Sequence, residues 1–259
     1  MKTNKTTRVT FSAESNAINV TLPKSWTELS QRELRTVYRC QTLCEPEDVI
    51  ITLFRALSGM DQVSHFEDGS FKARFESDLG PKYVRIWPEA LAEFTECLEF
   101  INDPGDDPVR FDAIDGHEAV DARLHGVTFH DYLQIETLIQ GYLMNQNPKA
   151  VKRLAVYLYP GYEGARPLGE AESLNIVTWV VQIKRHFARQ FRHFFRPAGE
   201  EVEDSTLLEI INAQIRALTG GDITKESEVY DTDCWRALTE LDAKAKEAED
   251  FRREQSKKP

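Results

Sequence analysis

The sequence predicts an α+β fold that is predominantly helical. In the first hundred residues, apolar and polar residues alternate over short stretches, with the period of two that is typical of strands. From Thr128 onward, apolar residues recur every three or four positions, between residues that favour helix ends. The two parts meet in NDPGDDP, residues 102–108, whose prolines, glycine and aspartates favour a loop.

The first predicted elements are a β-hairpin and a helix. Apolar residues alternate with polar ones over 9–13 and again over 18–22, with Ser15-Asn16 as the turn between them. A helix then begins after Ser30, because Ser30 and Glu33 have the spacing of a capping box.

Another helix and a second antiparallel element follow. Proline at its start and glycine at its end predict a helix from Pro46 to Gly59. Asp68-Gly69 predicts a tight turn between strands near 65–67 and 71–75, and a further strand covers 83–87. A third helix, from Pro88 to Ile101, completes an N-terminal region with two small antiparallel β elements and three helices.

The C-terminal region is expected to hold about five helices. They are predicted over residues 129–145, 148–158, 170–195, 205–218 and from about 232 onward. Glu136 is a misfit on the apolar face of the first of these helices. The predicted organisation is an α+β region over 1–101, a linker with weak strand character over 102–127, a helical region over 128–245 and a polar, frayed tail over 246–259. We expect these parts to form one compact unit.

Composition excludes several classes of protein. Hydrophobic residues make up 41%, enough for a packed core, and 32 Lys+Arg against 43 Asp+Glu leave a net charge of −11. The longest stretch without Asp, Glu, Lys or Arg, Thr137 to Pro148, is far shorter than the ~20 apolar residues of a spanning helix. The start of the chain shows no secretory signal, and its four cysteines are scattered. We therefore expect a cytoplasmic protein with no membrane partner.

Candidate metal sites fail on spacing. His117 and Glu118 begin like a zinc protease motif, but Asp121 stands where the second histidine is needed. The aspartates of 103–115 lack the spacing of a calcium-binding loop. Cys40 and Cys44 lie one helical turn apart, with no second ligand pair to join them. Motifs for nucleophilic catalysis and phosphate binding are missing from the sequence, so we expect no enzyme, no cofactor and no metal.

One charge feature stands out in this acidic chain. Residues 173–199 contain no acidic residue, and cations and phenylalanines recur there at helical spacing. Such a helix can bind a protein partner, although the phenylalanines could instead pack in the core while the cations pair with acidic groups of the same chain. The candidate partner-binding residues are Lys184, Arg185, Phe187, Arg189, Phe191, Arg192, Phe194 and Arg196.

Several stretches resemble a known group of proteins. They are LPKSWTELSQREL, FEDGSFKARF with WPEALAEFTECLEFI, VTFHDYLQIETLIQGYL with KAVKRLAVYLYPGY, FRHFFRP, and LTGGDITKESEVYDTDCWRALTELDAKA. Together they resemble uncharacterised proteins from the tail-assembly gene blocks of Bacteroidota phages and prophages, which look like tail assembly chaperones.

The resemblance implies a non-catalytic, mainly helical protein of the host cytoplasm. Its partners would be the tape-measure protein, which it coats, and the tail-tube proteins, which it recruits. No functional residue is carried over from the family, because it has no defined site motif. Two alternatives stay open: a structural virion component such as a tail-completion or neck protein, and a nucleic-acid-binding regulator that uses the basic helix 184–196. The acidic balance argues against nucleic acid. The oligomeric state, including a homo-oligomer, is left open.

Overall fold

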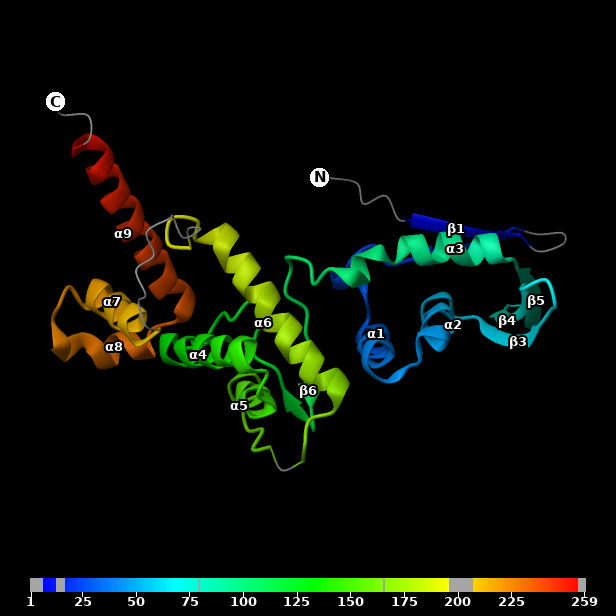
Figure 1. Cartoon of the computed structure of the whole chain (residues 1–259), viewed down its shortest axis with the longest axis horizontal. Coiled ribbons are helices and arrows are strands. Elements are labelled where there is room, and N and C mark those ends of the chain that lie inside the picture. Colours follow the sequence, from blue (N-terminus) through cyan, green and yellow to red (C-terminus); the bar gives the residue numbers. More distant parts are fainter. Residues whose placement is uncertain (1–6, 13–16, 79, 165, 196–206, 256–259) are drawn as a thin grey trace. The chain divides into compact units, whose positions relative to one another are not determined.

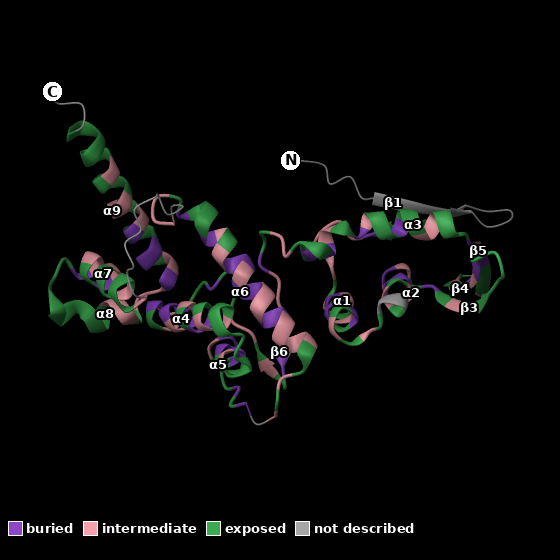
Figure 2. Cartoon of the chain, in the orientation of Figure 1, coloured by how far each residue is buried: buried purple, intermediate pink, exposed green. Residues whose placement is uncertain are grey.

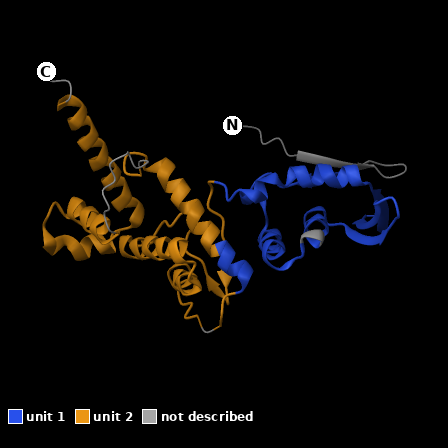
Figure 3. Cartoon of the chain, viewed as in Figure 1, with its two compact units in different colours: residues 1–105, 169–175 blue, residues 106–168, 176–259 orange. Residues whose placement is uncertain are grey.

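Residues 7–12, 17–78, 80–164, 166–195 and 207–255 are described by the computed structural model of the chain (Figure 1). Over these residues the fold is α+β and mainly helical, which confirms the predicted class. The chain forms two compact units, where the sequence suggested one (Figure 3). Unit 1 comprises residues 1–105 and 169–175, and unit 2 comprises residues 106–168 and 176–259. The sequence did not predict that residues 169–175 belong to unit 1.

Unit 1 begins with the predicted hairpin and a capped helix. Strands β1 (Thr7–Ser12) and β2 (Ala17–Leu22) pair antiparallel, and the predicted turn between them lies outside the described residues. After a short 3-10 helix, η1 (Trp26–Glu28), comes α1 (Gln31–Leu43). Its capping box is confirmed: Ser30 Oγ accepts from the backbone N–H of Glu33, and the Glu33 carboxylate accepts from the N–H of Ser30. Local sequence alone therefore sets this helix start.

A three-stranded sheet forms the second part of unit 1. Helix α2 (Pro46–Ser58) ends at Gly59, whose φ of 70° favours glycine. Strands β3 (Asp61–His65), β4 (Phe71–Ser77) and β5 (Gly80–Ile86) then pair antiparallel in the order β3-β4-β5. Helix α3 (Pro88–Cys97) follows, and η2 (Glu99–Asn102) replaces the last turn of the predicted helix.

Aromatic residues form the core between this sheet and the helices. Phe54 of α2 is fully buried, and its ring lies 5.3 Å from the rings of Phe71 on β4 and Phe94 on α3. Such edge-to-face contacts add to the burial of apolar surface. Phe71 and Ala73 on β4 and Val84 and Ile86 on β5 are buried, and buried residues of this unit are purple in Figure 2.

Most of the segment 102–127, predicted as a loop or linker with weak strand character, is loop in the structure and packs into unit 2. Ile114, Leu124 and Val127 are buried in the core of that unit. Two short strands, β6 (Ala113–Ile114) and β7 (His117–Glu118), lie within this segment. Distant groups satisfy the following backbone: Val120 N–H donates to Leu158 and Trp179 Nε1 donates to the carbonyl of Ala122. These long-range bonds leave no local pattern in the sequence.

Six α-helices make up the rest of the described part of unit 2, one more than predicted. They are α4 (Phe129–Asn145), α5 (Pro148–Leu158), α6 (Glu170–Gln190), which begins in unit 1, α7 (Leu207–Thr219), α8 (Glu226–Asp231) and α9 (Cys234–Gln255). The short elements η3 (Ile223–Lys225) and α8 were not predicted. The predicted caps Thr128 and Asn147 both accept backbone hydrogen bonds, and the predicted tail is a regular, mostly exposed helix as far as Gln255.

Candidate functional site

The basic, phenylalanine-rich segment at the end of α6 is where the sequence placed a partner-binding face. The structure instead buries Phe187 and Phe191 in the core of unit 2, at 1% and 4% exposure. Both rings lie 5.3 Å from the ring of Trp235 on α9. The prediction that Phe187 and Phe191 face a partner is therefore wrong, because α9 covers this side of α6.

The cations of the same segment have acidic partners within unit 2. Lys184 forms an ion pair with Glu136 of α4 at 2.7 Å, and Arg189 pairs with Asp106 at 2.8 Å. The structure thus shows the alternative interpretation for these residues: the phenylalanines pack in the core, and the cations pair with acidic groups of the same chain. Of the other candidates, Arg185 and Arg192 are exposed, and Arg196 lies outside the described residues.

The chain turns sharply after α6, and this turn positions the next phenylalanines. The sequence predicted a helix to Phe195, but α6 ends at Gln190. The Asp242 carboxylate on α9 accepts hydrogen bonds from the backbone N–H groups of His193 and Phe194, at 2.7 and 2.9 Å. The N–H of Phe194 also donates to the carbonyl of Phe191 at 3.2 Å, so the chain continues after Gln190 as a turn tied to α9. Phe194 and Phe195 then line a groove.

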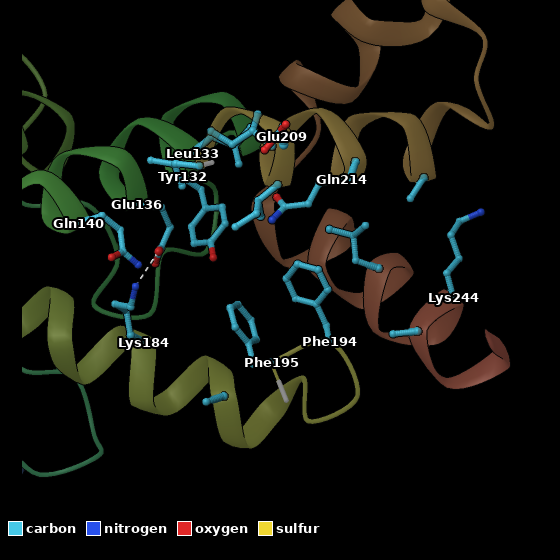
Figure 4. Close-up of a pocket in the computed structure, with 18 of the residues that line it drawn as sticks. Tyr132, Leu133, Glu136, Gln140, Lys184, Phe194, Phe195, Glu209, Gln214 and Lys244 are labelled. Atoms are coloured by element: carbon cyan, nitrogen blue, oxygen red, sulfur yellow. Dashed lines mark hydrogen bonds and ion pairs between the residues drawn. The ribbon is translucent and has the colours of Figure 1, made fainter. Parts of the chain in front are cut away.

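This groove opens between four helices of unit 2 and has a volume of about 1340 Å³. Its walls come from α4, α6, α7 and α9 together with the turn after α6 (Figure 4). Most of the lining side chains are apolar: Leu133, Ala188, Phe194, Phe195, Leu207, Ile210, Ile211, Ala213, Ala217, Leu241 and Ala245. Of the eight predicted residues, Lys184, Arg185 and Phe194 reach it.

Polar side chains interrupt this apolar lining, among them Tyr132, Glu136 and Lys184 on one side and Gln214 on α7 (Figure 4). The Glu136–Lys184 pair is largely shielded, with side-chain exposures of 17% and 29%. It explains the misfit that the sequence showed at Glu136. The side-chain oxygen Oε1 of Gln214 is buried and has no hydrogen-bond partner among the described residues.

Burial also determines the protonation of Tyr132. Loss of solvent, and next the nearby carboxylate of Glu136, raise the pKa of Tyr132 well above its ordinary value. The phenol therefore keeps its proton and can act as a hydrogen-bond donor. The lining of the groove thus includes one hydroxyl donor and one ion pair.

The α4 and α7 walls of the groove were missed by sequence reasoning. One signal was present on α4, the carboxylate of Glu136 on an apolar face. On α7 the signal was an excess of apolar residues: Leu208 and Ile210 are 66% and 44% exposed although unit 2 buries others of the same helix. A helix with apolar residues on more than one side indicates more than one packing surface.

The residues that the sequence analysis rejected as metal ligands can now be placed in the structure. Among the described residues, no three His, Cys, Asp or Glu side chains gather as a metal site would require. His117 lies on β7 and contacts the ring of Tyr162. Cys40 is buried, and burial, followed by the neighbouring Cys44, raises the pKa of its thiol to about 12. This thiol therefore stays protonated at neutral pH.

Comparison with protein-family models, curated proteins and solved structures gave no match. In the part of the chain that the structure describes, no helix is both long enough and apolar enough to cross a bilayer.

Proposed function

We propose that this protein is a non-catalytic binding factor that holds an amphipathic helix of a protein partner in the groove of unit 2. The groove itself is the observation that carries the proposal. Its volume of about 1340 Å³ exceeds the 300–1,000 Å³ or so of pockets for small molecules. A helix laid with its apolar face into a groove is a common mode of protein recognition, and such a helix buries several apolar side chains at once.

The composition of the groove walls supports this occupant. Phe194, Phe195 and Ile210 offer apolar anchor surface, and aromatic residues are enriched where interfaces hold most of their binding energy. Arg185, Lys244 and Glu209 also line the groove, and Lys244 pairs with Glu240 at 3.3 Å. Charges in these positions would orient a partner helix more than they would strengthen its binding.

The partner class follows from the resemblance to tail assembly chaperones. We propose the tape-measure protein as the source of the helix, because it is a long helical chain that needs its apolar faces covered before assembly. Tail-tube proteins would be recruited to the same complex. Two of the cations of α6, Lys184 and Arg189, already pair with carboxylates, which weakens the nucleic-acid alternative.

The test is a pull-down of the tagged protein, expressed with its native gene neighbourhood and treated with nuclease, followed by mass spectrometry. We expect recovery of a long helical protein, and a loss of at least tenfold with Ile210→Glu, which places a charge in the groove wall. The matched control is Ile223→Glu, because Ile223 is 77% exposed on η3 and does not line the groove.

Two results would contradict the proposal. One is recovery of no protein partner, and the other is a partner that binds Ile210→Glu as well as it binds the wild type while circular dichroism shows both folded. Mass spectrometry of mature particles separates the structural alternative, because a virion component stays in the particle and an assembly chaperone does not.

A further inference from the structure

The end of helix α1 brings two cysteine thiols together. Cys40 lies in the last turn of α1, and Cys44 is the residue that caps its C-terminus. Residues one turn apart lie on the same side of a helix, and the two thiols are within hydrogen-bonding distance of each other. Neither forms a disulfide in this structure. The pair belongs to unit 1 and is independent of the groove that carries the proposed function.

The two thiols differ in their access to solvent. Cys40 is 2% exposed and packs in the core of unit 1, so its sulfur is shielded from an oxidant in solution. Cys44 is only half-buried, and a dissolved oxidant can reach its sulfur. The accessible thiol therefore reacts first, and the buried thiol then reacts with its neighbour.

The position of Cys44 at the helix end allows its backbone to adjust. Cβ atoms one turn apart on a helix are about 5–6 Å apart, whereas a disulfide needs about 3.5–4.5 Å. Two cysteines inside a helix would have to break it, but Leu43 is the last helical residue of α1 and Cys44 has an extended ψ of 141°. A movement of about 1–2 Å therefore involves only the last turn of α1 and the short connection to α2, which begins at Pro46.

We infer that Cys40 and Cys44 form a reversible disulfide that opens the last turn of α1, with a hydroperoxide as the oxidant. The Cys44 thiolate attacks one oxygen of hydrogen peroxide, and the O–O bond breaks to give a sulfenic acid and, after protonation, water. The Cys40 sulfur then attacks the sulfenic sulfur, whose S–O bond breaks, and the departing hydroxide takes the Cys40 proton and leaves as water. In sum, two thiols are oxidised to one disulfide, and one peroxide is reduced to two waters.

The bridge would change one contact of α1 with the rest of unit 1. Gln41 lies between the two cysteines, and its side-chain amide donates to the carbonyl of Ile101 in η2 at 3.3 Å. Opening the turn moves Gln41 away from this carbonyl, so oxidation loosens the contact between α1 and η2. A bridge that requires this rearrangement is strained, and strained disulfides are the easily reduced ones. The pair therefore suits a reversible response to peroxide better than a permanent cross-link.

The experiment treats the full-length protein with hydrogen peroxide, blocks the remaining thiols with iodoacetamide and digests the protein with trypsin. Cleavage after Arg39 and Arg55 places both cysteines on one peptide, residues 40–55. We expect mass spectrometry to find most of this peptide two hydrogens lighter and without alkyl groups. Glutathione added before the blocking step should restore the doubly alkylated peptide. Hydrogen exchange over residues 41–44 should be faster in the oxidised protein.

Serine variants separate the pair from ordinary thiol oxidation. Cys40→Ser leaves Cys44 without its partner, so the sulfenic acid of Cys44 should persist and be trapped by dimedone. Cys97→Ser is the matched control, because Cys97 is also half-buried, at the end of α3, and it should leave the bridge unchanged. Cys44→Ser, at the more accessible position, replaces Cys40→Ser if that variant does not fold, and Cys40 should then stay unoxidised.

Three results would overturn the inference. The first is a 40–55 peptide that stays doubly alkylated after peroxide treatment of the folded protein. The second is a disulfide from Cys44 to Cys97 or to a second chain in place of the bridge to Cys40. The third is a bridge that glutathione does not reduce, because the disulfide would then be permanent. None of these results bears on helix binding in the groove, which the pull-down tests separately.

Discussion

Arg85 in unit 1 and Gln214 in unit 2 are both polar side chains among apolar and aromatic groups, but their surroundings differ. The guanidinium carbon of Arg85 lies 4.3 Å from the ring centroids of both Phe66 and Trp87. Its Nε donates to Ser70 Oγ at 2.7 Å, and it also pairs with Asp68. Gln214 Oε1, in contrast, has no partner among the described residues.

The difference lies in how far each unit satisfies the side chain from its own residues. Unit 1 satisfies the hydrogen-bonding and stacking capacity of Arg85 from its own turn and strand, so this aromatic surface needs nothing more. In the part of unit 2 that the structure describes, Gln214 Oε1 is a buried acceptor without a hydrogen-bond partner. Since exposed aromatic residues occur at the first site as well, unused hydrogen-bond capacity distinguishes the two better than exposed apolar area does.

The largest expected effect compares two tryptophans. Trp179 is fully buried in unit 2, and its Nε1 donates to the carbonyl of Ala122 at 2.7 Å, whereas Trp87 in unit 1 is 43% exposed. Trp179→Ala should lower the free energy of unfolding of unit 2 by about 3–5 kcal/mol, because it leaves a cavity. Trp87→Ala should cost about 1 kcal/mol or less. Urea titrations followed by hydrogen-exchange mass spectrometry resolve the two units. Equal costs would show that Trp87 also belongs to a core.

A smaller effect compares two ion pairs of similar chemistry. Glu136→Ala leaves Lys184 in the groove without its carboxylate, and we expect a loss of about 1–3 kcal/mol in the stability of unit 2. Glu76→Ala removes the partner of Arg74 on the outward side of β4, where both side chains are largely exposed, and should cause no measurable change. The same urea titrations measure both variants. A stable Glu136→Ala protein would mean that water already screens the groove pair.

The smallest expected effect is a difference in pH dependence. Burial, followed by the charges of Arg123 and Arg189, lowers the pKa of His186 below its usual value of about 6.5. The unfolded chain therefore binds a proton that folded unit 2 does not, so the stability of unit 2 should fall as the pH drops below about 6.5.

Unit 1 is expected to lose stability over a lower pH range. Hydrogen bonds from the side chain and backbone of Ser70, and then the charge of Arg85, lower the pKa of Asp68. Its contribution to stability is present above about pH 3.9 and is lost as the pH falls through the lower, folded-state pKa. Measuring the free energy of unfolding of each unit between about pH 7 and pH 5 tests whether unit 2 loses stability at higher pH than unit 1 does. His186→Gln should reduce the dependence in unit 2, and an unchanged slope would contradict this assignment.

Local elements of the fold could be predicted because their causes lie within a few residues. The capping box at Ser30, the cap at Thr128 and the glycine that ends α2 all act through the nearest backbone groups. The candidate site was predicted only in part. Sequence located the basic helix and flagged Glu136, but it could not show that Lys184 lies 2.7 Å from this carboxylate, 48 residues away along the chain.

The sequence by itself determined the fold class and most helix and strand positions, because periodicity and end signals are local. Tertiary structure decided which apolar faces are covered and which stay open. Trp235 covers Phe187 and Phe191, and Asp242 accepts the N–H of His193 in the turn that follows the end of α6 at Gln190. Both depend on the packing of α9 against α6, a contact between segments far apart in the chain. Helical periodicity shows that a face is apolar, and only packing shows whether the protein covers that face itself.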